Sequence, residues 1–336
     1  MSNATESLTS AAVSGTNGRA TRRERVAALT QRRGSVVVLA LVVVVASFAF
    51  ESFATVGNLQ NIAIQSSFLA IVALGMTFVI ISGGIDLSVG SVYALGGVLA
   101  AYGIQWGSVV GILLPLVVCG GIGLLNGVLV AYGRLAPFIV TLATLLGARG
   151  LVLAITDEGA TTRLMPRDAT LTEVGQGTFL GLGIPVWIAL VLFAVGVVVL
   201  QRTGFGHATF AIGGSPEAAT LMGLPVARNT MLLYLGSGLT AGLAGALAAA
   251  YSASGVTIVG EGLELDAIAA VVIGGTLLAG GAGTVGGTLA GVLLLRVIQN
   301  LINQIGTLSP HYQSVVSGAF LAVVVAVQAY LSRASR

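Results

Sequence analysis

Long apolar runs with almost no charge dominate this chain and constrain its fold more than any other sequence feature. Only 8% of the 336 residues are charged, 56% are hydrophobic, and the mean hydropathy is +1.00. Soluble domains carry roughly 25% charged residues, so this chain cannot cover a water-soluble surface. The apolar residues come in blocks instead of alternating with polar ones, which argues against an outer-membrane barrel. The sequence therefore predicts an all-α polytopic membrane protein.

The apolar blocks divide the chain into about ten transmembrane helices, since each helix needs about 20 apolar residues to cross the bilayer. The expected spans are 34–51, 60–81, 86–104, 108–132, 137–155, 183–201, 229–251, 265–280, 284–305 and 312–332. Residues 1–33 form a polar, arginine-rich tail that we expect to be unstructured, and residues 333–336 form a short end. The eighth span is the shortest and is interrupted by glycine, so a re-entrant segment there is an alternative.

The arginines, which are the only basic residues besides histidine, set the expected orientation. With the N-terminus inside, the cytoplasmic segments hold the arginines of the tail together with Arg134, Arg202, Arg228, Arg333 and Arg336. The outside loop over residues 156–182 holds only Arg163 and Arg167. This bias follows the positive-inside rule and places both termini in the cytoplasm. Arg149 and Arg296 fall inside spans, where each needs a partner or a cavity.

Residues that carry enzymatic chemistry are scarce. The single cysteine, Cys119, lies in an apolar run, and His207 and His311 are predicted on opposite sides of the membrane. A chain without lysine cannot contain a glycine-rich phosphate loop with its lysine. We therefore expect no enzyme, no metal site and no cofactor on this chain, so that any ATP-driven activity needs a partner chain. Nothing in the charge pattern suggests nucleic acid.

Glycine pairs suggest an internal repeat. The run Val79–Gly84 leads to Gly96-Gly97, and the run Val271–Gly275 leads to Gly286-Gly287. Transporter folds are often built from such duplications. The alternative is coincidence among the 48 glycines.

Asp86 is the only acidic residue between Glu51 and Asp157, and it falls at a break between two spans. An isolated charge at membrane depth suggests a role in binding substrate or an ion. The alternative is that Asp86 caps the helix that begins at Leu87, a position that the neighbouring Ser88 suits well.

Other polar residues within apolar spans extend this list of candidates. Asn126, Thr141 and Thr144 either line a hydrated path, where they would bond sugar hydroxyls, or bond across helices. The candidates for a translocation path are Gly83, Gly84, Asp86, Ser88, Asn126, Thr141 and Thr144.

The cytoplasmic loop over residues 202–228 contains the pattern of a short helix. Ser215 suits the N-cap, Pro216 the first helical position, and Glu217 the positive end of the helix. Gly223 can close the helix in the left-handed conformation. The apolar residues of this element are Ala218, Ala219, Leu221 and Met222. A helix this short is unstable alone and must pack on the membrane domain or on another protein.

An acidic turn, predicted outside, precedes the eighth span. It contains Glu261, Glu264 and Asp266. These residues either contact a partner or form a solvated loop with acids at a helix start.

Three separated motifs resemble one family. The run Gly83–Gly90, with the sequence GGIDLSVG, resembles the signature of the ribose-type permeases of ABC sugar importers. The runs Gly123–Gly127 and Pro137–Leu142 match in the same order, as does Glu264–Gly275. Glu217-Ala218-Ala219 with Gly223 also resembles the element by which importer permeases contact their ATPases. The resemblance covers about residues 36–332.

The resemblance implies a permease subunit in the bacterial plasma (inner) membrane with a permease domain over residues 34–332. Such a permease pairs with a second copy or a paralogue, with cytoplasmic ATPase subunits that bind ATP and Mg, and with an extracytoplasmic sugar-binding protein. The short helix would then be the coupling helix, and the substrate a pentose, a hexose or a related monosaccharide. Relatives also carry branched-chain amino acids and nucleosides. The alternative is an ion-coupled secondary transporter that uses Asp86, which leaves the short helix unexplained.

Overall fold

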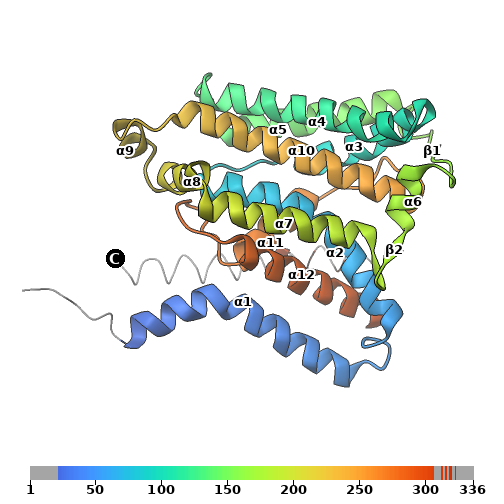
Figure 1. The fold of residues 1–336 in the computed structure, drawn as a ribbon, viewed down its shortest axis with the longest axis horizontal. Coiled ribbons are helices and arrows are strands. Elements are labelled where there is room, and N and C mark those ends of the chain that lie inside the picture. The colour runs from blue at the N-terminus through green and yellow to red at the C-terminus, as the bar shows by residue number, and fades with distance from the viewer. Residues whose placement is uncertain (1–21, 306–311, 313–314, 316–317, 320–321, 323–336) are drawn as a thin grey trace, which may run out of the picture.

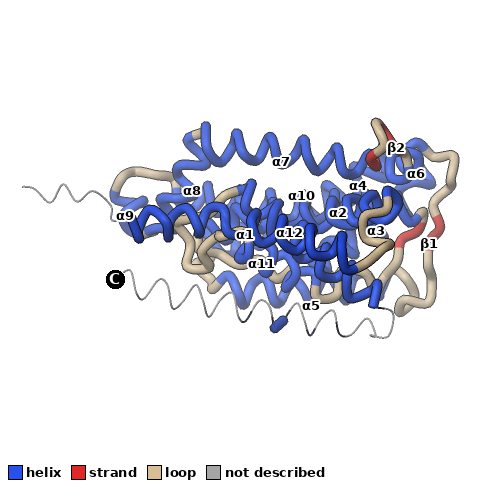
Figure 2. Tube along the Cα trace, turned by 90° about the horizontal axis from the view of Figure 1, so that it is seen from below, coloured by secondary structure: helices blue, strands red, loops and turns tan. Residues whose placement is uncertain are grey.

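A computed structural model describes residues 22–305 and positions 312, 315, 318, 319 and 322. Most of these residues are helical, and the long helices lie side by side in one elongated bundle (Figure 1). In Figure 2, α7 and α5 flank the bundle on opposite sides, with α2, α10 and α12 between them. The fold is that of an all-α polytopic membrane protein, as predicted.

The order of the elements is as follows. The long helices are α1 (Arg22–Ala49), α2 (Val56–Ile81), α4 (Ser108–Ala131), α5 (Pro137–Ile155), α7 (Ile184–Arg202), α10 (Val226–Ser252) and α12 (Val285–Ile305). The shorter helices are α3 (Val89–Gly103), the 3₁₀ turn η1 (Ile104–Trp106), α6 (Thr170–Gln176), α8 (Gly204–Gly214), α9 (Pro216–Leu221) and α11 (Leu263–Ile273). Four two-residue strands form two antiparallel pairs, β1 (Arg163–Leu164) with β4 (Ser254–Gly255) and β2 (Thr178–Phe179) with β3 (Leu182–Gly183).

Six helices in the described part of the chain are long and apolar enough to cross a membrane, namely α2, α4, α5, α7, α10 and α12. Each corresponds to a predicted span, and the ends agree within a few residues. The span predicted at 312–332 lies outside the described residues except for isolated positions.

Two predicted spans are not complete spans. The helix α3 has 15 residues and α11 has 11. At 1.5 Å per residue these are about 22 Å and 16 Å long, less than the ~30 Å hydrocarbon core. The structure therefore does not show full spans at 86–104 and 265–280; Gly83 and Gly275 take the left-handed conformation and interrupt the helical path, and the short α11 fits the re-entrant alternative for the eighth span.

The helix α1 begins earlier than the first predicted span. It starts at Arg22, so the segment 22–33 of the expected tail is helical. This segment is rich in arginine and also contains alanine, leucine, glutamine and glutamate, all of which favour helix, and extending an existing helix costs little. Residues 1–21 lie outside the described part.

The helix α2 lies at the centre of the bundle. In its most apolar stretch 83% of the residues are buried, against 22% in α5 and 28% in α7, whose faces are left for lipid. Glycines let α10 pack closely on its neighbours. A methyl group on Gly96 of α3 would lie 2.8 Å from the Cα of Gly242, and one on Gly123 of α4 would lie 3.0 Å from the Cα of Gly238.

The two short helices α3 and α11 begin beside each other inside the bundle. The segment 253–262 passes along α3, with Gly255 against Ala101 and Gly260 against Gly90. It therefore enters the bundle from the end that carries the strands and reaches the first turn of α3. From there α11 continues toward the end opposite the strands. The two helices therefore start beside each other inside the membrane domain and extend in opposite directions. Interrupted helices of this kind surround binding sites in transporters.

Candidate functional site

The short helix α9 forms as the sequence predicts. The Ser215 hydroxyl accepts a hydrogen bond from the backbone N–H of Ala218 at 3.2 Å, and Pro216 occupies the first helical position. Glu217 lies in the first turn, where its carboxylate accepts a bond from the Ser215 hydroxyl at 3.2 Å. Gly223 ends the element with φ +79°.

The surface of α9 is suited to docking. Leu221 is 90% exposed and Met222 is 76% exposed, whereas Ala219 is buried against the rest of the chain. The helix lies at one extremity of the bundle, which we call the α9 end, and the strands and α6 lie at the far end (Figure 1). Two large apolar side chains are therefore held out at the α9 end of the bundle.

A junction of glycines joins α9 to the core. Gly213 and Gly214 end α8 just before the cap of α9, and Gly213 lies against the carbonyl oxygen of Ile81, the last residue of α2. That oxygen accepts a hydrogen bond from the N–H of Gly281 at 2.8 Å. We call Ile81, Gly213 and Gly281 the glycine junction. Backbone contacts therefore connect the segment before α9 to the end of α2 and to the turn before α12.

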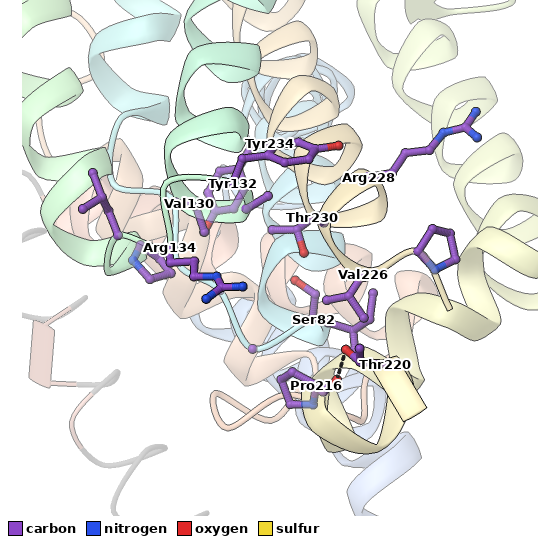
Figure 3. A pocket seen from close by; sticks show the side chains of 18 of the residues that line it. Ser82, Val130, Tyr132, Arg134, Pro216, Thr220, Val226, Arg228, Thr230 and Tyr234 are labelled. Carbon is purple, nitrogen blue, oxygen red and sulfur yellow. Dashed lines mark hydrogen bonds between the residues drawn. The ribbon is translucent and has the colours of Figure 1, made fainter. Parts of the chain in front are cut away.

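A cavity of 860 Å³ opens beside α9 (Figure 3). Its walls come from Ser82–Gly84, from the α4–α5 connection, from Pro216 and Thr220 of α9, and from the first turns of α10. We call it the α9 cavity. It brings the path candidates Gly83 and Gly84 together with the predicted docking helix.

The segment between α2 and α3 forms the deep wall of this cavity. Tyr234 lines the cavity, and its hydroxyl donates a hydrogen bond to the carbonyl of Ile85 at 3.3 Å. The hydroxyl of Thr141 lies 3.5 Å from the same carbonyl. Two helices therefore support the exposed backbone of the break between α2 and α3.

Asp86 is fully buried behind this wall. Its Oδ1 accepts hydrogen bonds from the backbone N–H of Ser88 at 3.0 Å and from the Ser88 hydroxyl at 2.6 Å. Asn126 donates to the same hydroxyl at 3.0 Å. The second carboxylate oxygen has no hydrogen-bond partner among the residues that the structure describes. Asp86 thus holds the turn that starts α3 at Val89, two residues later than the predicted helix start at Leu87.

The remaining path candidate is separate from this cluster. Thr144 donates only within its own helix, to the carbonyls of Val140 and Thr141. Of the predicted set, the structure brings Ser88, Asn126 and Asp86 into hydrogen-bond contact. Tyr234 was not predicted as a site residue, because a tyrosine in an apolar span does not by itself indicate a functional role.

The acidic residues before α11 are not a solvated turn throughout. Glu261 is exposed, but Glu264 lies beside Gly90 in the first turn of α3. Asp266 accepts a hydrogen bond from the side chain of Gln299 at 3.2 Å. Glu264 and Asp266 lie in the first turn of α11, so the expectation of acids at a helix start is confirmed for them, but both are partly buried inside the bundle instead of solvated.

Arg149 is partly buried and has backbone partners, and its charge also acts on the carboxylate of Glu264. It donates hydrogen bonds to the carbonyls of Thr257 at 2.8 Å and Val259 at 3.4 Å. The arginine thus supports the non-helical segment, whose carbonyls have no helix to accept their bonds.

Comparisons with known proteins agree with this architecture. Residues 58–325 match the family model described as branched-chain amino acid transport system / permease component. The chain is 40% identical over 297 residues to the ribose import permease RbsC of Bacillus subtilis, covering 88% of this chain and 92% of the relative. It is 39% identical over 302 residues to the ribose import permease RbsC of Escherichia coli K12, covering 89% and 94%.

An arabinose permease is also similar. The L-arabinose permease AraH of Azospirillum brasilense is 35% identical over 304 residues, covering 90% of this chain and 88% of the relative. No solved structure matches the chain.

Proposed function

The chain belongs to the family of branched-chain amino acid transport system / permease components and is a ribose-type permease subunit of an ABC importer, and from this premise we propose that it carries a neutral monosaccharide, a pentose such as ribose or arabinose, across the bacterial inner membrane. It is a multi-pass membrane subunit and not the enzyme that hydrolyses ATP. The family works with ATPase subunits and a binding protein. In this proposal ATP and Mg are bound by the ATPase chains.

The proposed topology has ten membrane crossings or half-crossings with both termini in the cytoplasm. It consists of the six long apolar helices, α1, the half-helices α3 and α11, and residues 312–332. The arginine bias then places the α9 end in the cytoplasm and the strands outside. The permease domain spans residues 34–332, and a second permease copy or paralogue completes the translocation core.

In this proposal the exposed helix α9 contacts the ATPase and couples its movement to the permease. Its apolar end, Leu221 and Met222, fits a groove on a partner protein. When ATP binding brings the ATPase subunits together, α9 moves, and the glycine junction passes this movement to the end of α2. The α9 cavity, walled by Ser82–Gly84, then opens or closes toward the cytoplasm, as alternating access requires. An ion-coupled mechanism through Asp86 gives α9 no role, and the relatives are ABC permeases.

Reconstitution tests the substrate class. The permease, its ATPase and its binding protein are placed in proteoliposomes, and the uptake of D-ribose, L-arabinose and L-leucine is measured with and without ATP inside the vesicles. We expect ATP-dependent uptake of a pentose and no uptake of leucine. Uptake of leucine alone, or uptake that follows an ion gradient without ATP, would contradict the proposal.

We predict that Leu221→Asp weakens the binding of the ATPase about 30-fold. A central contact residue typically contributes ~2 kcal/mol or more to binding, which is a factor of about 30. Leu221 is 90% exposed, so the substitution leaves the permease fold intact. Co-purification of the ATPase with the detergent-extracted permease measures the effect.

The matched control for this variant is Leu180→Asp. Leu180 is 77% exposed between β2 and β3 at the far end, so the same change occurs away from α9. It should leave the ATPase bound. Equal co-purification of ATPase with both variants would remove α9 as the docking helix.

A further inference from the structure

A second set of polar side chains lies between α2 and α12, away from the α9 cavity. On α2 these residues follow at intervals of three and four, and on α12 they lie within positions i, i+3, i+4 and i+7, so on each helix they share one face. They are Asn58, Asn61 and Gln65 on α2 and Arg296, Gln299, Asn300 and Asn303 on α12. Polar stripes within membrane-spanning helices are costly in lipid and mark functional surfaces.

Hydrogen bonds fix the two stripes against each other. The amides of Asn58 and Asn300 bond reciprocally, at 3.2 Å and 2.8 Å. Arg296 donates to the Gln299 side chain at 2.8 Å, and Gln299 donates to Asp266 at 3.2 Å. The positive charge of Arg296 is therefore linked to the negative charge of Asp266 through one amide, which leaves the region close to neutral.

Between the stripes is a pocket of 340 Å³, which we call the amide pocket. It is lined by one apolar residue, Ile62, and by the polar residues Asn61, Gln65, Arg296, Gln299, Asn300 and Asn303. Asn61 and Gln65 are exposed, and their side chains make no hydrogen bond to the described residues. Gln65 lies nine residues into α2, which is ~14 Å along the helix. Lipid tails cannot satisfy amide groups at that depth, so these two side chains need polar partners other than the described residues.

The amide pocket opens in the half of the bundle that faces the strands. Gln60, one turn from Gln65 on α2, donates a hydrogen bond to the carbonyl of Gly181 between β2 and β3 at 2.8 Å. In the proposed topology this half faces outward. The amide pocket and the α9 cavity share no lining residue, so they are separate compartments toward the two sides of the membrane.

We propose that the amide pocket binds the neutral sugar in the outer half of the membrane, as an early station on its way to the α9 cavity. The inference rests on the proposed function and assigns residues to the entry of the substrate. Amide side chains both donate and accept hydrogen bonds, as sugar hydroxyls do. The volume of 340 Å³ is within the range of small-molecule sites. Because Asp266 offsets the charge of Arg296, the pocket favours a neutral polyol over an anion.

Cysteine labelling tests the pocket directly. Cys119 is the only cysteine of the chain, so Cys119→Ala gives a background for single cysteines. In that background Gln65→Cys is placed in the pocket, and Leu59→Cys, an exposed apolar position on the same helix, is the control. The assembled importer in right-side-out vesicles is treated with a membrane-impermeant maleimide. The treatment is carried out in the presence of D-ribose, in the presence of L-arabinose, and without sugar.

We expect the cysteine at position 65 to be labelled and the pentose that the wild type imports to slow its labelling several-fold, while the sugar leaves any labelling at position 59 unchanged. Labelling that sugar does not change would overturn the inference. So would efficient cross-linking between the position-65 cysteines of two copies, because a second permease would then fill the pocket.

A transport variant gives an independent measurement. Gln65→Leu should raise the KM for sugar uptake about fivefold, since one net hydrogen bond to the sugar is lost. The control is Gln60→Leu, the same substitution on the same helix outside the pocket, which should leave KM unchanged. An unchanged KM in Gln65→Leu would contradict the inference while the wild type still imports sugar. If the wild type imports no sugar, the proposed function fails instead.

Discussion

Gly213→Ala is expected to reduce sugar uptake at least 100-fold, whereas Gly214→Ala, the same change one residue later, should leave it close to the wild-type rate. A methyl group on Gly213 would overlap the carbonyl oxygen of Ile81 and lie 2.5 Å from the amide nitrogen of Gly281. Neither group can move away freely, because they bond to each other at 2.8 Å. A methyl group on Gly214 meets nothing within 4 Å.

Helix propensity makes this comparison sharper. Both glycines belong to α8, and alanine is favoured over glycine inside a helix by up to ~1 kcal/mol. The local effect of both substitutions is therefore stabilising. At Gly213 this stabilising effect is opposed only by the contact with α2. Overpacking there costs about 1–3 kcal/mol and separates α8 from the end of α2. Any loss of transport confined to Gly213→Ala thus comes from the glycine junction.

The measurements are pentose uptake, the amount of permease in the membrane, and ATP hydrolysis by the assembled importer. We expect Gly213→Ala to reach the membrane and to bind the ATPase, because α9 keeps its caps and its exposed face. ATP should then be hydrolysed without transport. Wild-type uptake by Gly213→Ala would show that the junction does not carry the movement of α9 to α2.

Hydropathy predicted the complete spans well because they depend on local composition. The ends of α5 at Pro137 and Ile155 agree with the predicted boundaries, and the caps of α9 at Ser215 and Gly223 follow from the chemistry of single residues. The half-helices were predicted poorly. An apolar stretch of about 15 residues does not reveal at what depth it begins, and that depth is set here by Gly83 and by the segment 253–262 packing along α3.

The parts of the candidate site that are formed by residues close together in the sequence could be predicted. The parts that join distant segments could not. Asp86 and Ser88 are two residues apart, so their turn could be expected from the sequence. The amide pocket joins residues 61–65 to residues 296–303, and no local pattern indicates that these stripes face each other. Glu264 and Asp266 stand at a helix start as expected, but their partial burial depends on the segment 253–262 packing along α3, which no local pattern indicates.

Asp86→Leu is expected to abolish uptake, whereas Asp86→Asn should retain most of it. Leucine would leave the N–H and hydroxyl of Ser88 without their acceptor inside the core, at a cost of about 1–3 kcal/mol for each unsatisfied group. The turn that starts α3 would then be lost, together with the deep wall of the α9 cavity. Asparagine keeps the acceptor oxygen in place, and it caps helix starts about as well as aspartate.

The pair of variants separates the structural role of Asp86 from an ionic one. Uptake and membrane level are measured for both variants at equal expression, with sodium present and absent. If Asp86 holds the turn, the asparagine variant transports at both sodium levels, because the acceptor geometry matters and the charge does not. An ion site at this position needs the carboxylate itself, since the second oxygen, Oδ2, makes no hydrogen bond to the described residues and would bind the ion. Loss of uptake in Asp86→Asn at normal membrane level would therefore assign Asp86 a direct role in transport, and retained uptake would assign it to the architecture of the break between α2 and α3.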